Sequence, residues 1–408
     1  MKRNRDVTIN SEAVDSAFSE LEEYNSYYEN VSVIFRIISF VLFALLLIFT
    51  VSSAFAGADA FSYSNFEFII RNFALTLEEN KDSARQPIRF DPDALKQFEL
   101  FGEGIAVCGS NSLSLYSATG RQTCSESFSY RSPILKSSDK YVLVFDENTG
   151  DYSVYNSFSR VHSDSIEKPI KDAVVSDEGY YALISSSDLY NSTVEIYDPN
   201  FSIINRFNKN GYVACVDVSD NRVAILTADV GSDPAHFSIE IMIADLNDTS
   251  SARTETFEAG YPLSCMITSD GVSVVCTDSV YFFDSSCRKI SSYDFGEGSL
   301  YDIALGSESV CLLFKSTGFA ISYELISLDL SGNINYKGTF TETVFDLDVF
   351  GDTAFVLTEK EVHCINESSS GSVDIGSADY GCKLNAFDSR TVYFCSDFSA
   401  SVLTFSAD

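Results

Sequence analysis

The sequence contains no tryptophan, only three histidines, and 27 lysines and arginines against 59 aspartates and glutamates. The formal net charge of −32 argues against binding to nucleic acid or to an anionic lipid surface, because both need a basic face. At the same time, 45% of the 408 residues are hydrophobic, which is too many for a disordered acidic chain. We therefore expect a folded protein that binds no nucleic acid.

Local catalytic and metal-binding motifs are also missing. The sequence has no Gly-x-Ser-x-Gly, no His-Glu-x-x-His and no phosphate-binding glycine loop. None of the ten cysteines forms a Cys-x-x-Cys pair, so we predict neither a metal site nor another cofactor. Most cysteines lie in strand-like runs, where a thiol serves as a small buried apolar group. Disulfides and a reactive thiol remain alternatives.

One long uncharged segment accounts for much of the apolar content. From Ile37 to Ala56, twenty residues pass without a charge, which as a helix would span about 30 Å, the thickness of a bilayer core. We predict a transmembrane helix at residues 34–56. A cleaved signal peptide is the alternative, because Ala54-Phe55-Ala56 fits the small-x-small cleavage pattern.

Basic residues are more frequent before this segment than directly after it, which predicts a cytosolic tail at residues 1–33 and an extracytoplasmic carboxy-terminal domain. Residues 57–86 contain apolar positions at helical spacing and are expected to form a juxtamembrane helix and linker. The domain outside the membrane would then comprise residues 87–408. The basic residues concerned are Lys2, Arg3, Arg5 and Arg36 before the segment and Arg71 after it.

Short β-branched and aromatic runs alternate with Gly, Asp, Asn and Ser turns throughout residues 87–408. One strand-then-turn phrase recurs eight times at intervals of 37 to 47 residues, which is typical of a β-propeller. We predict an all-β fold of about eight four-stranded blades, with seven as the alternative. The last residues before the repeated turn are Tyr116, Tyr155, Tyr197, Ala244, Phe283, Leu328, Ile365 and Phe405.

The two ends of the repeat complement each other. The last unit supplies only three strands, and the strand-like piece Pro87–Phe90 precedes the first unit. Pairing of this piece as the missing fourth strand would close the ring and remove two exposed sheet edges. The Trp-Asp pairs and aspartate boxes that mark some propellers are absent, so they point to no function here.

Three phrases carry a resemblance to a family: SNFEFIIRNFAL, IRFDPDALKQFELFGEGIAV and, most closely, KYVLVFDENTGDYSVYNSFSRV from Lys140 to Val161. With them, the chain resembles an uncharacterised family of Gram-positive bacterial single-pass membrane proteins with a predicted extracytoplasmic β-propeller. The resemblance implies this topology and fold. It implies no reaction and transfers no functional residue.

The connections between the second and third predicted strands are longest in three units, at Ser185–Ser192, Ala228–Phe237 and Lys315–Ser322. In a propeller these connections share one face, and long loops on a rigid scaffold often bind ligands. We predict a binding or scaffold module for a protein or cell-envelope ligand, with insertions that have no role as the alternative. The candidate residues are Tyr190, Asp229, Asp233, His236, Lys315 and Phe319.

A second hypothesis is an extracytoplasmic hydrolase or lyase that acts on glycans. Aspartates in the first strands of several units could meet at the mouth of the central channel, and paired carboxylates are the usual catalytic groups for glycoside cleavage. Solvated strand ends would explain the same pattern. These aspartates are Asp172, Asp217, Asp302, Asp346 and Asp348.

Overall fold

The computed structural model describes residues 32–33, 35–40, 42–43, 87–90 and 97–405, apart from positions 220, 234, 297, 319 and 320. The chain divides into two compact units, Met1–Ile69 and Ile70–Asp408. Most of the predicted cytosolic tail and the whole predicted juxtamembrane segment, residues 57–86, lie outside the described residues, as does the candidate Phe319.

In the first unit, the described residues between positions 32 and 43 are helical. Their large apolar side chains, including Phe35, Phe40 and Phe43, are exposed. Within the ranges given above, no helix has the length and apolar character needed to cross a membrane. The transmembrane helix at 34–56 therefore stays a prediction.

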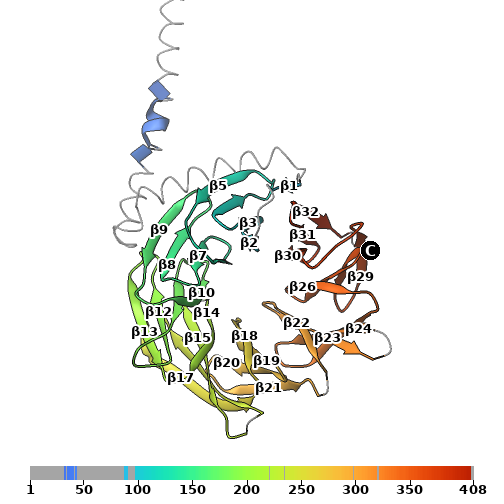
Figure 1. Ribbon diagram of the computed structural model, residues 1–408. Helices are drawn as coiled ribbons and strands as arrows, with labels where there is room; N and C mark the ends of the chain where they lie inside the picture. The colour runs from blue at the N-terminus through green and yellow to red at the C-terminus, as the bar shows by residue number, and fades with distance from the viewer. Residues whose placement is uncertain are drawn as a thin grey trace, which may run out of the picture. The chain divides into compact units, whose positions relative to one another are not determined.

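The second unit is a ring of eight blades, each a four-stranded antiparallel sheet (Figure 1). Blades 1 to 4 consist of β2 (Gln97–Phe101), β3 (Gly104–Cys108), β4 (Ser112–Tyr116) and β5 (Gln122–Ser127); β6 (Pro133–Ser137), β7 (Val142–Asp146), β8 (Asp151–Tyr155) and β9 (Arg160–Ser165); β10 (Ile170–Val175), β11 (Tyr181–Ser185), β12 (Ser192–Tyr197) and β13 (Ile203–Lys209); and β14 (Tyr212–Ser219), β15 (Arg222–Val230), β16 (Phe237–Asp245) and β17 (Asp248–Ala259).

Blades 5 to 8 continue the same order. They consist of β18 (Pro262–Ile267), β19 (Gly271–Cys276), β20 (Ser279–Asp284) and β21 (Lys289–Asp294); β22 (Leu300–Leu305), β23 (Ser309–Thr317), β24 (Ile321–Asp329) and β25 (Ile334–Phe340); β26 (Val344–Phe350), β27 (Thr353–Thr358), β28 (Glu361–Ile365) and β29 (Ser370–Asp374); and β30 (Lys383–Asp388), β31 (Thr391–Cys395) and β32 (Ser399–Thr404), completed by β1 (Ile88–Arg89).

The ring closes through its first strand. β1 pairs antiparallel with β32, with Ile88 opposite Ala400 and Arg89 opposite Ser399. The predicted all-β propeller, its eight blades and the closure by Pro87–Phe90 are thus confirmed, and the seven-blade alternative is wrong. Because the side chain of Ile88 is buried in a core shared by blades 8 and 1, this pairing joins the two ends of the repeat by apolar packing as well as by hydrogen bonds.

The ring has two unlike faces. We call the face that carries the turns from the first to the second and from the third to the fourth strand of each blade the turn face. The opposite face, the loop face, carries the connections from the second to the third strand and from each blade to the next. The amide of Phe90 donates to the carbonyl of Phe398, in a loop-face connection, at 2.9 Å. The chain therefore enters β1 from the side of the turn face.

The repeated phrase of the sequence is explained by turns on the turn face. In blade 3, one carboxylate oxygen of Asp198 accepts the amides of Asn200 and Ser202 at 3.0 and 2.8 Å. An aspartate or asparagine directly after the repeated strand residue makes this kind of Asx turn because its side chain satisfies amides that the turn leaves free. The equivalent residues in other blades are Asn156, Asp284, Asp329 and Asn366.

The hydrophobic core is divided among the contacts between neighbouring blades. One cluster, for example, packs Leu226 and Ile241 of blade 4 against Val274 and Phe283 of blade 5. All ten cysteines are buried, including Cys215 and Cys265 in this cluster. Their burial agrees with the interpretation of these thiols as small apolar residues.

Candidate binding surface

Two blades rise above the loop face. β15 and β16 in blade 4 and β23 and β24 in blade 6 have nine residues each, against six in β19 of blade 5. Three further residues at about 3.3 Å each add about 10 Å of strand. The predicted long loops at Ala228–Phe237 and Lys315–Ser322 are therefore shorter than expected. Their ends belong to the strands, which stay paired as far as Val230 with Phe237 and Thr317 with Ile321.

Large apolar side chains gather around these raised blades. Val230 is 87% exposed and Tyr212 is 65% exposed, and the rings of Phe237 and Tyr261 meet edge to face at 5.4 Å. Residues 97–188, which include all of blades 1 and 2, expose no large hydrophobic side chain. Exposed large apolar side chains occur from Leu189 onward, in blades 3 to 8. We call the loop-face set in blades 4 to 6 the apolar crescent; it comprises Tyr212, Val230, Phe237, Tyr261, Leu263 and Ile321.

Four of the predicted site residues adjoin the crescent. His236 lies between two carboxylates, with Nδ1 3.4 Å from Asp233 and Nε2 3.7 Å from Asp278 of blade 5. Asp229 caps its own strand, since its carboxylate accepts the amide of Val230 at 2.8 Å. These contacts hold the loop between β15 and β16 in place. They also put carboxylates next to the exposed apolar side chains of the crescent.

Lys315, on β23 of blade 6, lies over two tyrosine rings. Its ammonium is 5.0 Å from the ring centre of Tyr301 and 5.4 Å from that of Tyr323. Hydrogen bonding to the Tyr323 hydroxyl raises the pKa of Lys315. In the described part of the propeller, no group of three or more His, Cys, Asp or Glu side chains has a geometry that could hold a metal ion.

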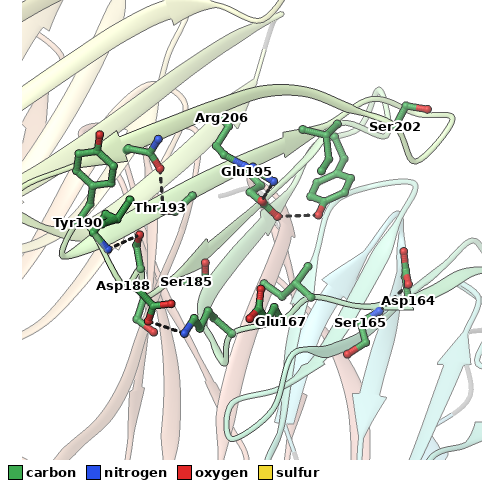
Figure 2. Close-up of a pocket in the computed structure, with 18 of the residues that line it drawn as sticks. Asp164, Ser165, Glu167, Ser185, Asp188, Tyr190, Thr193, Glu195, Ser202 and Arg206 are labelled. Atoms are coloured by element: carbon green, nitrogen blue, oxygen red, sulfur yellow. Dashed lines mark hydrogen bonds and ion pairs between the residues drawn. The ribbon is translucent and has the colours of Figure 1, made fainter.

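Tyr190 lies apart from the crescent, at a cleft between blades 2 and 3 with a volume of about 900 Å³ (Figure 2). One wall is the end of β9 and the linker that follows it, and the other is formed by β12, β13 and the loop with Tyr190. Within the cleft, Glu195 pairs with Arg206 and accepts the hydroxyl of Tyr197 at 3.0 Å. The sequence did not predict this pair, because Glu195 and Arg206 are opposite each other only through the pairing of β12 with β13.

The inner-strand aspartates bind the neighbouring blade. A carboxylate oxygen of Asp217 accepts the amide of Ile267 at 2.6 Å, and one of Asp348 accepts that of Ala386 at 2.7 Å. Asp346 accepts the amide of Leu384 at 2.7 Å and pairs with Lys383 at 2.6 Å. Their partners belong to the next blade around the ring.

Asp172 and Asp302 follow the same pattern less completely. The carboxylate of Asp172 is 2.9 Å from the ammonium of Lys136 in blade 2. Asp302 accepts the amide of Ile303 at 2.9 Å and also that of Leu347 in blade 7. All five predicted carboxylates thus have hydrogen-bond or ion-pair partners that link or cap strands, which gives them a structural explanation.

Acidic groups near the ring axis are nevertheless perturbed. Burial raises the pKa of Asp348 to about 7, and the nearby Asp346 and Glu99 carboxylates act in the same direction. Burial likewise raises the pKa of Glu99 to about 7 and that of Asp302 to about 6. Glu99 was not predicted from the sequence, where its only signal is an acidic residue within the strand QFELF.

By its fold, the molecule belongs to the class of β-propellers. Its fold is that of β-propellers such as BamB from Moraxella catarrhalis, with 12% sequence identity over 78% of this chain and 98% of BamB and a TM-score of 0.52. Similar values hold for Sqt1 of Saccharomyces cerevisiae (10% identity, 78% and 98% of the chains, TM-score 0.53) and for the computationally designed Ika8 (9%, 78% and 98%, 0.58). At these identities the likeness shows the fold alone.

The chain belongs to the DUF5711 family, a family of unknown function whose model matches residues 84–377. The expected membership in an uncharacterised family with a propeller is therefore confirmed. The membrane anchor and the Gram-positive origin that the resemblance implied stay predictions. No curated protein sequence matches this chain.

Proposed function

We propose that this protein is a membrane-anchored, extracytoplasmic binding module that holds a protein partner on its loop face. The observation that carries the proposal is the apolar crescent. Large apolar side chains exposed close together are costly in water, and on a folded protein they commonly mark an interaction surface. These side chains lie on blades 4 to 6 of a rigid ring, and binding surfaces are commonly carried by such a rigid scaffold.

The charge beside the crescent defines the partner further. Asp229, Asp233 and Asp278 lie next to its apolar side chains, and the chain as a whole has a net charge of −32. Such a surface attracts basic groups and repels acidic ones. The partner is therefore a protein segment that combines lysine or arginine with large apolar side chains.

The anchor in this proposal is the uncharged segment Ile37–Ala56, with the amino terminus in the cytosol. It is supported by the exposed apolar side chains of the described helical residues and by the basic residues that precede the segment. Residues 87–90 enter β1 from the side of the turn face, opposite the loop face. Protease added to intact cells should digest the propeller; its protection would contradict this orientation.

Site-specific photocrosslinking tests the partner site. Phe237 and Tyr261 would each be replaced by p-benzoylphenylalanine in the full-length protein in its own membrane, with Ile290 and Ile334, exposed residues near the turn face, as matched positions. We expect one protein adduct from the two crescent positions and none of that mass from the two controls. The same adduct from all four positions, or adducts only from the controls, would overturn the proposal.

A further inference from the structure

The cleft between blades 2 and 3 is distinct from the apolar crescent and has the dimensions of a ligand site. Its volume of about 900 Å³ is within the range of roughly 300–1,000 Å³ that is usual for small-ligand pockets. From Thr193 to Tyr197, β12 forms one wall over about 13 Å, at about 3.3 Å per residue. A cleft of this length accepts an oligomer more readily than a single compact molecule.

The charges in the cleft are already paired with each other. The ammonium of Lys168 is 2.6 Å from the carboxylate of Asp188, and Arg206 pairs with Glu195. The other charged lining residues, Asp164 and Glu167, are both acidic. A phosphate or carboxylate ligand would therefore meet repulsion and find no basic lining group without a carboxylate beside it.

The polar lining consists mainly of hydroxyl groups. Hydroxyls both donate and accept hydrogen bonds, so they match a ligand that does the same. The hydroxyl-bearing residues include Ser165, Ser185, Ser186, Ser187, Thr193 and Ser202. This lining suits a neutral ligand with many hydroxyl groups.

Glu195 and Arg206 provide a hydrogen-bond acceptor and a donor, respectively, in the middle of the cleft (Figure 2). The side chain of Glu195 is only 11% exposed, and both of its oxygens are oriented, one by Arg206 and one by the Tyr197 hydroxyl. A carboxylate has about four acceptor positions and a guanidinium five donor hydrogens, so each group keeps capacity for a ligand. Adjacent hydroxyls of a sugar could donate to Glu195 and accept from Arg206 at once.

An aromatic side chain completes the site. Figure 2 shows Tyr190 at one end of the cleft, Glu195 and Arg206 in the middle, and Asp164 and Ser202 at the other end. Tyr190 is 39% exposed and offers an amphipathic ring against which the C–H groups of a sugar can pack. From this arrangement we propose that the cleft binds a neutral oligosaccharide.

Saturation-transfer NMR on the full-length protein in detergent tests the assignment. The probes are hexamers of β-1,4-linked glucose and β-1,4-linked N-acetylglucosamine, the deacetylated and cationic glucosamine hexamer, and a blocked hexapeptide of alternating threonine and valine. We expect transfer to at least one neutral hexamer, and at least tenfold weaker binding after Tyr190→Ala and after Glu195→Gln. Tyr380→Ala, which removes an exposed tyrosine outside both the cleft and the apolar crescent, should leave the affinity unchanged.

Two cleft variants are used so that the test still holds if one of them misfolds. Tyr190 is exposed, so its replacement leaves the core intact even if Glu195→Gln lowers stability. Absence of transfer to both neutral hexamers overturns the proposal, as does unchanged affinity in both variants. Binding of the cationic hexamer alone would assign the cleft to amines, and binding of the peptide alone would assign it to strand addition; either result contradicts a neutral glycan.

Discussion

Carboxylates on the inner strands are bonded to the next blade, whereas large apolar side chains on the loop face are exposed to solvent. Asp346 and Asp348 accept backbone amides across a blade boundary, while Val230 and Tyr212 have little protein around them. The polar residues that resembled a catalytic cluster in the sequence thus hold the ring together. The apolar residues, which had no part in that hypothesis, form the surface available to a partner.

The largest effect should come from breaking a bond between blades. Asp346→Ala removes the ion pair with Lys383 and leaves the amide of Leu384 without its acceptor. We expect the free energy of unfolding to fall by about 2–4 kcal/mol, because a buried donor and a cation both lose their partner. Denaturant unfolding of the full-length protein measures this change.

Glu342→Ala is the matched control for that variant, since it removes the same charge from an exposed position just before β26. Its effect should stay within about 0.5 kcal/mol. If both variants lost the same free energy of unfolding, the inner-strand carboxylates would stabilise the ring no more than surface charges do. The inner strands and the exposed surface would then not differ in the way proposed.

An intermediate effect should appear in the dependence of stability on pH. The pKa of Asp348 is about 7 in the folded protein and about 3.9 in an unfolded chain. Between these values the folded state binds more protons, so this group's contribution to the free energy of unfolding falls as pH rises from about 4 to about 7. The variant Asp348→Asn has no such titration.

Thermal unfolding at pH 5 and pH 8 would measure the difference. We expect the wild-type melting temperature to fall more than that of Asp348→Asn over this interval, by about 1.5 °C for each kcal/mol of stability lost. Comparing the two proteins cancels the contributions of the histidines and of the remaining carboxylates. If the melting temperatures of the two proteins changed equally with pH, ionising Asp348 would cost the folded state no free energy. That result would contradict a pKa raised by burial.

The smallest effect on stability should come from the loop face. The double variant Val230→Ser and Tyr212→Ser replaces two exposed apolar side chains, so the free energy of unfolding should change by no more than about 1 kcal/mol. The yield of the crosslinked adduct from position 261 should nevertheless fall at least fivefold. A marked loss of stability, or an unchanged adduct, would mean that these side chains serve the fold rather than a partner.

Much of the architecture could be predicted because it repeats. The residue after each repeated strand forms an Asx turn in five blades, and such a turn depends on a few neighbouring residues. The closing strand at Ile88 was predictable because the last unit was one strand short. The long loops of blades 4 and 6 were predicted with the wrong boundaries, since continuing a ladder depends on the partner strand.

The candidate sites were less predictable, for a physical reason. Glu195 and Arg206 are opposite each other only through the β12–β13 register, and Asp217 meets the amide of Ile267 only because blades 4 and 5 pack side by side. Contacts between successive blades join residues about twenty to fifty positions apart, and no local pattern encodes them. A sequence can therefore show which residues are polar without showing which of them face each other.

By itself, the sequence determined the class of fold, the period of the repeat, the closure of the ring and the acidic character of the chain. Each of these depends on composition or on short-range patterns such as strand alternation and turn-forming residues. Only the tertiary structure decided which carboxylates are bonded between blades, which apolar side chains stay exposed and where the cleft lies. These features follow from packing between distant segments, where burial and distance decide what a side chain can do.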